Sequence, residues 1–527
     1  MKFSTHITRK LSAAAIILTV MLATSCSKTS DIHETIPDDA AVVVHLDLKQ
    51  LIDNAELREK GKSYALPKEF DELNNDGLEE DLEMLYKMKD CVDLSNIFVV
   101  NISRENGETA RYDEPHDYGE YVTFPITDFD EFEKQIKSMD YSKDSSESGL
   151  ECYTMSKYEW ATNYMLVNES HTQGWHANIE NKVDYDYDTD KRKIIHNPPQ
   201  VVTAAVKKAE RGSLADVKGP ANVLKSGKAI SLVATHKILK NKWFTCTAEA
   251  LGDGEAQLEA NLMDADGTLC ALDNYFNTVN TNALALLPDD ADLVAAMSLN
   301  VPNDLKLIED LIGKFGSERD LRMFKQQAKL IETTGDVAFG AKLASFDNLL
   351  NSNFYHAEQL LEGKWTLVVG VKDPETILGL IKSFCGGDAR ITDIGDKKFD
   401  IEINRNLYRY DYTRDTDVFD ARLSATLHVG VMDGYLYVST VDVKNSPVPA
   451  QVSKVFDNAS FGIYAHTPSK IKTYFDLPNE ITATARWKGT HTLVVNAKFE
   501  NSTHGFIYDV INMCFRAEKQ MKKNINY

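Results

Sequence analysis

The sequence predicts an α+β protein of two tandem, related modules, each a mostly antiparallel sheet packed with helices. A short motif occurs twice, at residues 36–40 (IPDDA) and 287–291 (LPDDA), each time just before an apolar strand. A strand followed by an acidic helix start and an Ile-Lys-Ser ending also occurs twice, up to residues 138 and 383. Strands joined by hairpins, without a βαβ rhythm, favour antiparallel sheets.

The first module is predicted to cover residues 36–281. Residues 41–48 alternate as a strand, with Val42 and Val44 on one face and His45 and Asp47 on the other. A helix begins near Asp128, which can cap it. The segment 169–200 is mostly polar and predicts no strand. The remaining predicted strands and helices are strands 97–102, 121–126, 152–154, 163–167, 230–235, 242–251 and 255–263, and helices 49–59, 78–89 and 200–210.

The second module is predicted to cover residues 287–520 and to repeat the order of the first. A terminal amphipathic helix over 506–519 is compared with a predicted helix over 269–279. Two further helices are expected, one capped by Asn303 and one over 319–332. The strands are expected at 336–340, 365–371, 398–403, 423–429, 435–440, 461–466, 481–487 and 492–499.

Composition indicates a folded, acidic protein. The chain has 527 residues, 43% of them hydrophobic, and a formal net charge of −22. This length predicts two to three domains. The negative charge disfavours a nucleic-acid partner, because phosphate backbones bind basic surfaces.

The N-terminus predicts export and lipid anchoring. Lys2, Arg9 and Lys10 precede a short apolar run at residues 11–22, which is too short to span a bilayer permanently. Small residues then lead to Cys26, as in the lipobox of bacterial lipoproteins. We therefore expect a signal peptide over 1–25, lipidation of the Cys26 thiol and a polar tether over 26–35. An ordinary secretory signal cut near residue 23 is the alternative.

The other cysteines show no metal-binding spacing. No CxxC pair occurs. Export would permit disulfides, with Cys246 and Cys270 as the first candidate pair, but small buried apolar thiols are the simpler interpretation. The six thiols in question are Cys91, Cys152, Cys246, Cys270, Cys385 and Cys514.

Three groups of polar residues are candidate sites. The acidic run 184–190 lacks the glycine and glutamate of a calcium loop, so a solvated loop is favoured. His171 and His176 have no evident third metal ligand, so surface histidines are favoured. His45 and Asp47 could act as an acid–base pair, but outward polar positions explain them better.

Catalytic signatures are absent from the sequence. It contains no GxSxG, Walker, GxGxxG or HExxH motif. No catalytic, cofactor-binding or metal-binding residue is therefore predicted, and whether the protein is an enzyme stays open, with the balance towards a non-enzyme.

The chain resembles the large lipoproteins of Bacteroides and relatives, a domain-of-unknown-function family numbered 4836. The resemblance is carried by residues 23–26 (ATSC), 36–40 and 433–439 (DGYLYVS). It implies a lipid-anchored protein of the Gram-negative cell envelope, on the periplasmic side or at the outer-membrane surface, and it brings no catalytic residues.

Two functions are compatible with these features. The first is a non-enzymatic envelope lipoprotein that binds a ligand, an envelope protein or a glycan, or has a structural role. The alternative is a glycan-directed hydrolase with paired carboxylates in a cleft between the modules.

Overall fold

The protein is described by a computed structural model. It describes residues 32–73, 76–103, 118–144, 149–158, 161–186, 191–235, 239, 242–271, 275–300, 322, 333–345, 357–385, 390–395, 397–411, 416–474, 476–488 and 491–525.

The chain divides into two compact units. The first comprises Met1–Cys270 with Asn501–Glu518, and the second comprises Ala271–Glu500 with Lys519–Tyr527. Both contain helices and strands, and every ladder between their described strands is antiparallel. The predicted α+β class with antiparallel sheets is confirmed.

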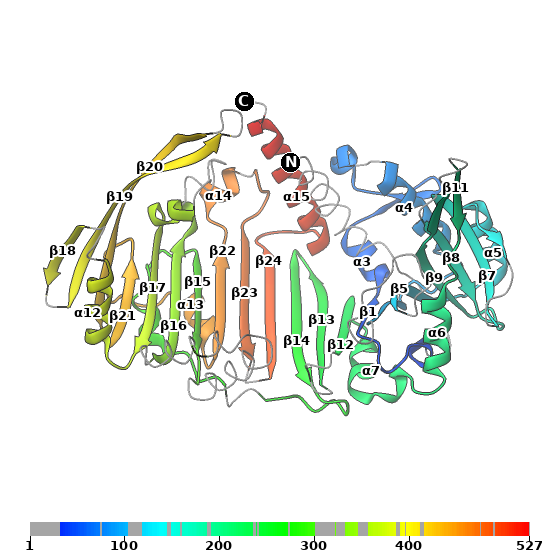
Figure 1. The fold of residues 1–527 in the computed structure, drawn as a ribbon, viewed down its shortest axis with the longest axis horizontal. Helices are drawn as coiled ribbons and strands as arrows, with labels where there is room; N and C mark the ends of the chain where they lie inside the picture. The colour runs from blue at the N-terminus through cyan, green and yellow to red at the C-terminus, as the bar shows by residue number, and fades with distance from the viewer. Residues whose placement is uncertain are drawn as a thin grey trace. The chain divides into compact units, whose positions relative to one another are not determined.

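In the first unit the strands follow the order β14-β13-β12-β1-β4-β5-β9-β8-β7-β6 (Figure 1). Two further hairpins, β2–β3 and β10–β11, stand apart from this sheet. The strands are β1 (Val42–Leu46), β2 (Arg58–Lys60), β3 (Ser63–Ala65), β4 (Ile97–Ile102), β5 (Gly119–Pro125), β6 (Ser142–Lys143), β7 (Glu151–Tyr158), β8 (Ala161–Val167), β9 (Gln173–Glu180), β10 (Lys182–Asp186), β11 (Lys191–Ile195), β12 (Ile230–Thr235), β13 (Trp243–Gly252) and β14 (Glu255–Met263).

Helices cover both faces of this sheet. On one face, Val202 and Leu224 of α6 and α7 pack with Val43 of β1. On the other, Leu51 of α3 and Phe132 of α5 pack with strand residues. The helical elements are η1 (Ile32–Thr35), α3 (Leu48–Asn54), η2 (Lys68–Leu73), α4 (Asp76–Met88), α5 (Phe129–Ser138), α6 (Gln200–Ala209), η3 (Leu214–Asp216) and α7 (Lys218–Leu224).

The last helix, α15 (Phe506–Ile525), contributes its first turns to the first unit. Tyr508 and Ile511 pack with Phe70 and Leu82. The Glu56 carboxylate lies 3.0 Å from His504 Nδ1, just before the helix. Apolar contact and this hydrogen bond therefore attach the C-terminal segment to α3, η2 and α4.

In the second unit the strands follow the order β24-β23-β22-β15-β16-β17-β21-β20-β19-β18. The hairpin β19–β20 is much longer than its neighbours and pairs without a break except for one bulge after Leu407. The strands are β15 (Leu293–Ser298), β16 (Thr333–Lys342), β17 (Lys364–Val371), β18 (Arg390–Gly395), β19 (Lys398–Asp411), β20 (Thr416–Met432), β21 (Tyr435–Ser439), β22 (Phe461–His466), β23 (Ile481–Lys488) and β24 (Thr492–Phe499).

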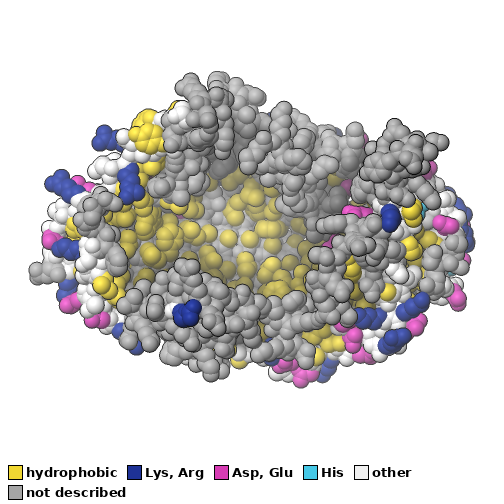
Figure 2. Space-filling view, viewed as in Figure 1, with side chains coloured by type: hydrophobic (Ala, Val, Ile, Leu, Met, Phe, Trp, Pro, Cys, Tyr) yellow, Lys and Arg dark blue, Asp and Glu magenta, His cyan; other side chains and the backbone are white. Residues whose placement is uncertain are grey.

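One sheet face of the second unit is closed by α8 and α13, where Leu284 and Phe456 pack with Val294. At the far strands, Leu378 and Ile381 of α12 pack with Phe399. Figure 2 shows further apolar side chains on the face of this unit that is turned to the viewer. The helical elements are α8 (Thr281–Leu284), η5 (Leu343–Ser345), η6 (Ala357–Glu362), α12 (Pro374–Cys385), α13 (Ala450–Phe456) and α14 (Ser469–Tyr474).

Three predictions about these segments are wrong. The helix predicted over 49–59 ends at Asn54, and residues 58–60 form β2 instead. The polar stretch 169–200 contains β9, which pairs with both β5 and β8. Its Trp175 and Ala177 are buried, so alternate apolar residues sufficed for a central strand. Residues 275–280 are not helical, and Phe276 bridges to Leu299 instead. The helices expected at 303 and 319–332 lie outside the described residues, apart from Arg322.

Candidate functional site: an apolar cavity in the first unit

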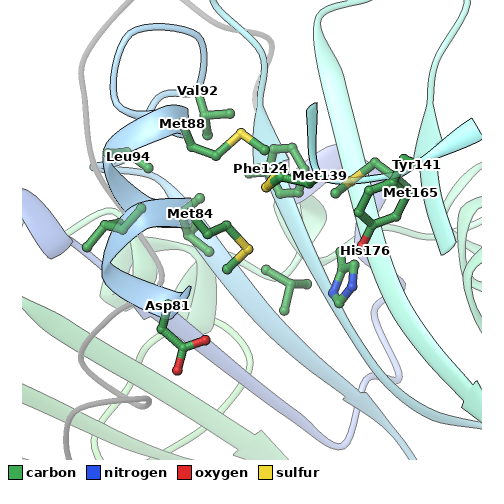
Figure 3. A pocket seen from close by; sticks show the side chains of 13 residues that line it. Asp81, Met84, Met88, Val92, Leu94, Phe124, Met139, Tyr141, Met165 and His176 are labelled. Atoms are coloured by element: carbon green, nitrogen blue, oxygen red, sulfur yellow. The ribbon is translucent and has the colours of Figure 1, made fainter. Parts of the chain in front are cut away.

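An apolar cavity of about 230 Å³ lies in the first unit between α4 and the sheet. Figure 3 shows its lining side chains, which come from α4, the segment between α4 and β4, four neighbouring strands and the segment after α5. They are Asp81, Met84, Leu85, Met88, Val92, Leu94, Ile97, Val122, Phe124, Met139, Tyr141, Met165 and His176.

Strand pairing fixes the floor of the cavity. Val122 of β5 is paired with His176 of β9, and His176 is paired with Met165 of β8. Directly paired residues point to the same side of a sheet, so these three side chains form a row. Phe124 lies two residues after Val122 and shares that side. The alternation of each strand therefore builds this wall.

Gly174 allows the aromatic part of the wall to lie where it does. A Cβ atom at this position would lie 2.4 Å from Cε2 and 2.7 Å from Cζ of Phe124. Such distances are well inside van der Waals contact. The Phe124 ring therefore occupies the space above the glycine, and no other residue type fits there without displacing it.

His176 is held in its neutral form. Loss of solvent contact among apolar side chains lowers the pKa of its imidazole to about 4. The ring forms no hydrogen bond with any residue that the structure describes. At neutral pH it therefore presents one N–H donor and one nitrogen acceptor to the cavity.

The other polar groups of the lining are also biased towards neutrality. Burial, and next the charge of Glu80, raises the pKa of the Asp81 carboxyl. Burial raises the pKa of the Tyr141 hydroxyl. No lysine or arginine is among the described residues that line the cavity. The cavity is therefore suited to an uncharged, largely apolar molecule.

Four methionines, Met84, Met88, Met139 and Met165, line the cavity. Methionine is flexible and polarizable, so a wall rich in it can adapt to different apolar shapes. Of these four residues, the sequence pattern identifies only Met88 as inward-facing, because it belongs to the apolar stripe of α4. Their convergence depends on which strands become neighbours, which local periodicity does not show.

The prediction of His176 as a surface histidine needs correction, because its side chain is only partly exposed and lines this cavity. His171 lies apart from it. The ring of His171 stacks on Phe129 with centroids 3.7 Å apart, and its Nε2 lies 3.3 Å from a Glu151 oxygen. The two histidines thus have different surroundings and form no joint site.

His45 and Asp47 have structural roles. His45 is buried, which corrects its prediction as an outward position, and its Nε2 lies 2.8 Å from the carbonyl of Ser95. Burial lowers the pKa of the His45 imidazole. Asp47 caps α3 by accepting the backbone N–H of Gln50 at 3.1 Å. The hypothesis of an acid–base pair therefore has no support.

Metal binding finds no support either. In the part of the chain that the structure describes, no group of three or more histidine, cysteine or acidic residues could hold a metal ion. Residues 184–186 of the acidic run lie in β10, which corrects their prediction as loop, and residues 187–190 lie outside the described part.

None of the five cysteines whose side chains are described forms a disulfide: Cys91, Cys152, Cys246, Cys270 and Cys514. The candidate disulfide between Cys246 and Cys270 is therefore not formed. The Lys242 ammonium lies 3.1 Å from the sulfur of Cys270 instead. Cys26, the predicted lipidation site, lies outside the described residues.

Comparisons with protein-family models, curated proteins and solved structures gave no match to this chain. The resemblance to the Bacteroides family stays a prediction. Within the described residues, no helix combines the length and the apolar character needed to cross a membrane.

Proposed function

We propose that this protein is a non-enzymatic, lipid-anchored binding protein of a Gram-negative cell envelope that holds an apolar ligand in the cavity of its first unit. The observation that carries the proposal is the cavity itself, which is partly open and almost entirely apolar. Large, well-formed apolar pockets with a few polar groups are the usual binding sites of proteins.

The lining also disfavours the hydrolase alternative at this site. Among the lining residues that the structure describes, Asp81 is the sole carboxylate. Glycoside hydrolysis commonly uses two carboxylates that face each other across the scissile bond. The cavity therefore supports binding rather than acid–base chemistry.

We further propose that the two units arose by duplication of one α+β module, with predicted boundaries 36–281 and 287–520. Three features support it. The strand orders correspond position by position, from β14 with β24 to β6 with β18. The corresponding strands β5 and β17 each lead into a helix that an aspartate caps, Asp128 for α5 and Asp373 for α12. The opening motifs precede β1 and β15.

If the two units correspond in this way, the histidine of the cavity, His176, has no counterpart in the second unit. Val122 and Leu367 each lie six residues before the capping aspartate. Val122 pairs with His176, and Leu367 pairs with Val438. Because valine satisfies the same sheet position, the fold does not require a histidine there. A role in binding gives a reason for His176.

Cys26 supplies the proposed anchor. Small residues before this cysteine and the preceding apolar run support cleavage and acylation. Two or more acyl chains would attach the protein stably to a membrane.

The binding proposal is tested with benzene as a simple apolar probe. The mature chain carries ¹³C-labelled methionine methyl groups, assigned by single Met→Leu substitutions. Titration should shift the resonances of the four cavity methionines. Val122→Phe fills the cavity and should abolish the shifts, whereas Leu367→Phe at the matching position of the second unit should preserve them. Shifts that are absent, or equal in both variants, would refute a ligand-binding cavity.

A further inference from the structure

We infer, resting on the proposed function, that the ligand of the cavity is a neutral apolar alcohol: a short alkyl chain or an aromatic ring that carries one hydroxyl group. Three properties of the cavity lead to this class, namely its size, its lack of charge and the position of its unused hydrogen-bonding groups.

The volume of the cavity accommodates about nine carbon atoms of a ligand. A dry protein cavity of about 150 Å³ binds benzene, which has six carbons. The cavity here has a volume of about 230 Å³, roughly half as large again. A chain of eight carbons with a terminal oxygen fills that volume, whereas a sterol or a full-length lipid chain would extend beyond it through the open side.

Charge excludes ionic ligands. The described part of the lining provides no lysine or arginine to pair with an anion, and an anionic ligand would meet the carboxyl group of Asp81. A cation could approach Asp81, but it would lose its hydration among methionine and aliphatic side chains. An uncharged molecule meets neither the repulsion by Asp81 nor the loss of hydration of an ion, so burial of its apolar surface contributes in full to the binding free energy.

Hydrogen bonding selects a hydroxyl group. Neither the imidazole of His176 nor the hydroxyl of Tyr141 bonds to a residue that the structure describes. In the view of Figure 3 the two lie at one end of the cavity and Asp81 lies at the other. A neutral imidazole both donates and accepts, as does a phenol. An alcohol, which also does both, satisfies these groups, whereas a plain hydrocarbon leaves them unpaired.

The test compares ligands with the same chain and different head groups. 1-Octanol, octanoate and octylammonium are titrated at pH 7 into the methionine-labelled mature chain, with benzene as the reference probe. Octanol should bind most tightly. Octanoate should bind about 100-fold more weakly, because it must bury its charge or take up a proton more than two pH units above its pKa.

Substitution of His176 tests the hydrogen bond. His176→Val installs the residue of the matching position in the second unit. It should weaken octanol binding about fivefold, the effect of one net hydrogen bond, and leave benzene binding unchanged. His171→Asn removes a histidine outside the cavity and should change neither affinity. The asparagine suits this position because the backbone there has φ of 57°.

The outcomes separate the two proposals. If octanoate or octylammonium binds as tightly as octanol while benzene binds, the ligand class is wrong and the binding cavity stands. If His176→Val leaves octanol affinity unchanged, the assigned hydrogen bond is wrong. If none of the four probes shifts the cavity methionines, the proposed function fails together with its ligand.

Discussion

Replacing Gly174 by alanine should destabilise the first unit through one buried ring. The added Cβ would lie 2.4 Å from Cε2 of Phe124, so the ring must move by about 1 Å to restore ordinary contact. The ring is 7% exposed and packs on Phe132 with centroids 5.9 Å apart, so it has little room to move. Overpacking of this kind costs about 1–3 kcal/mol.

The glycine itself offsets part of that cost. Restricting the unfolded chain by a Gly→Ala change contributes about 0.4–1 kcal/mol of stability, which leaves a net loss of about 1–2 kcal/mol. For a unit of this size, the loss corresponds to a fall in melting temperature of about 2–8 °C. Hydrogen exchange of the β9 amides should show the same loss of stability. Because this measurement reports on β9 alone, unfolding of the second unit does not obscure it.

Gly379→Ala provides a matched control. This glycine lies on the exposed side of α12, and a Cβ there would meet nothing within 4 Å. The change should stabilise the protein by about 0.5–1 kcal/mol, because alanine is the better helix former. If Gly174→Ala proves as stable as Gly379→Ala, the reasoning about Phe124 is wrong. A second variant, Phe124→Leu combined with Gly174→Ala, should recover part of the loss.

Four further predictions concern other parts of the chain. Because the pKa of His176 is lowered to about 4, its contribution to stability is complete above pH 6.5 and is lost as pH falls towards 4. The free energies of unfolding of wild type and His176→Val, measured by denaturant titration, should therefore diverge over that window by at most about 3 kcal/mol; a difference that stays constant with pH would contradict a neutral imidazole at this position. Asp128→Ala and Asp373→Ala should each cost about 1 kcal/mol, measured by urea unfolding, whereas asparagine at either position should be nearly neutral. Burial raises the pKa of the Cys91 thiol to about 12, so iodoacetamide at pH 8 should label it only after unfolding, as peptide mass spectrometry would show. Finally, Cys26→Ser should move the protein from the detergent-rich to the aqueous phase of a Triton X-114 extraction; unchanged partitioning would refute the anchor.

Much of the fold was predictable because its signals are local. Alternation and turn residues located the closing strands β12, β13 and β14, and a single aspartate marked the start of α5. The strand β9 was missed, since polar residues at alternate positions conceal its buried Trp175. Its burial comes from pairing with β5 and β8, which lie outside any local window.

The residues of the cavity were harder to predict from local sequence patterns. His176 was noticed, but a histidine beside polar neighbours reads as a surface residue until the strands on either side are known. His45 shows the same limitation: its alternation was assigned correctly, yet helices cover both faces of the sheet, so it is buried rather than exposed.

By itself, the sequence determined the α+β class, the positions of most strands and the absence of known catalytic motifs, because periodicity, caps and motifs are properties of neighbouring residues. Tertiary structure alone decided that four methionines, a tyrosine and a neutral histidine from separate elements enclose one cavity. The physical reason is that cavity volume, desolvation and unused hydrogen-bonding capacity arise only where distant segments pack together.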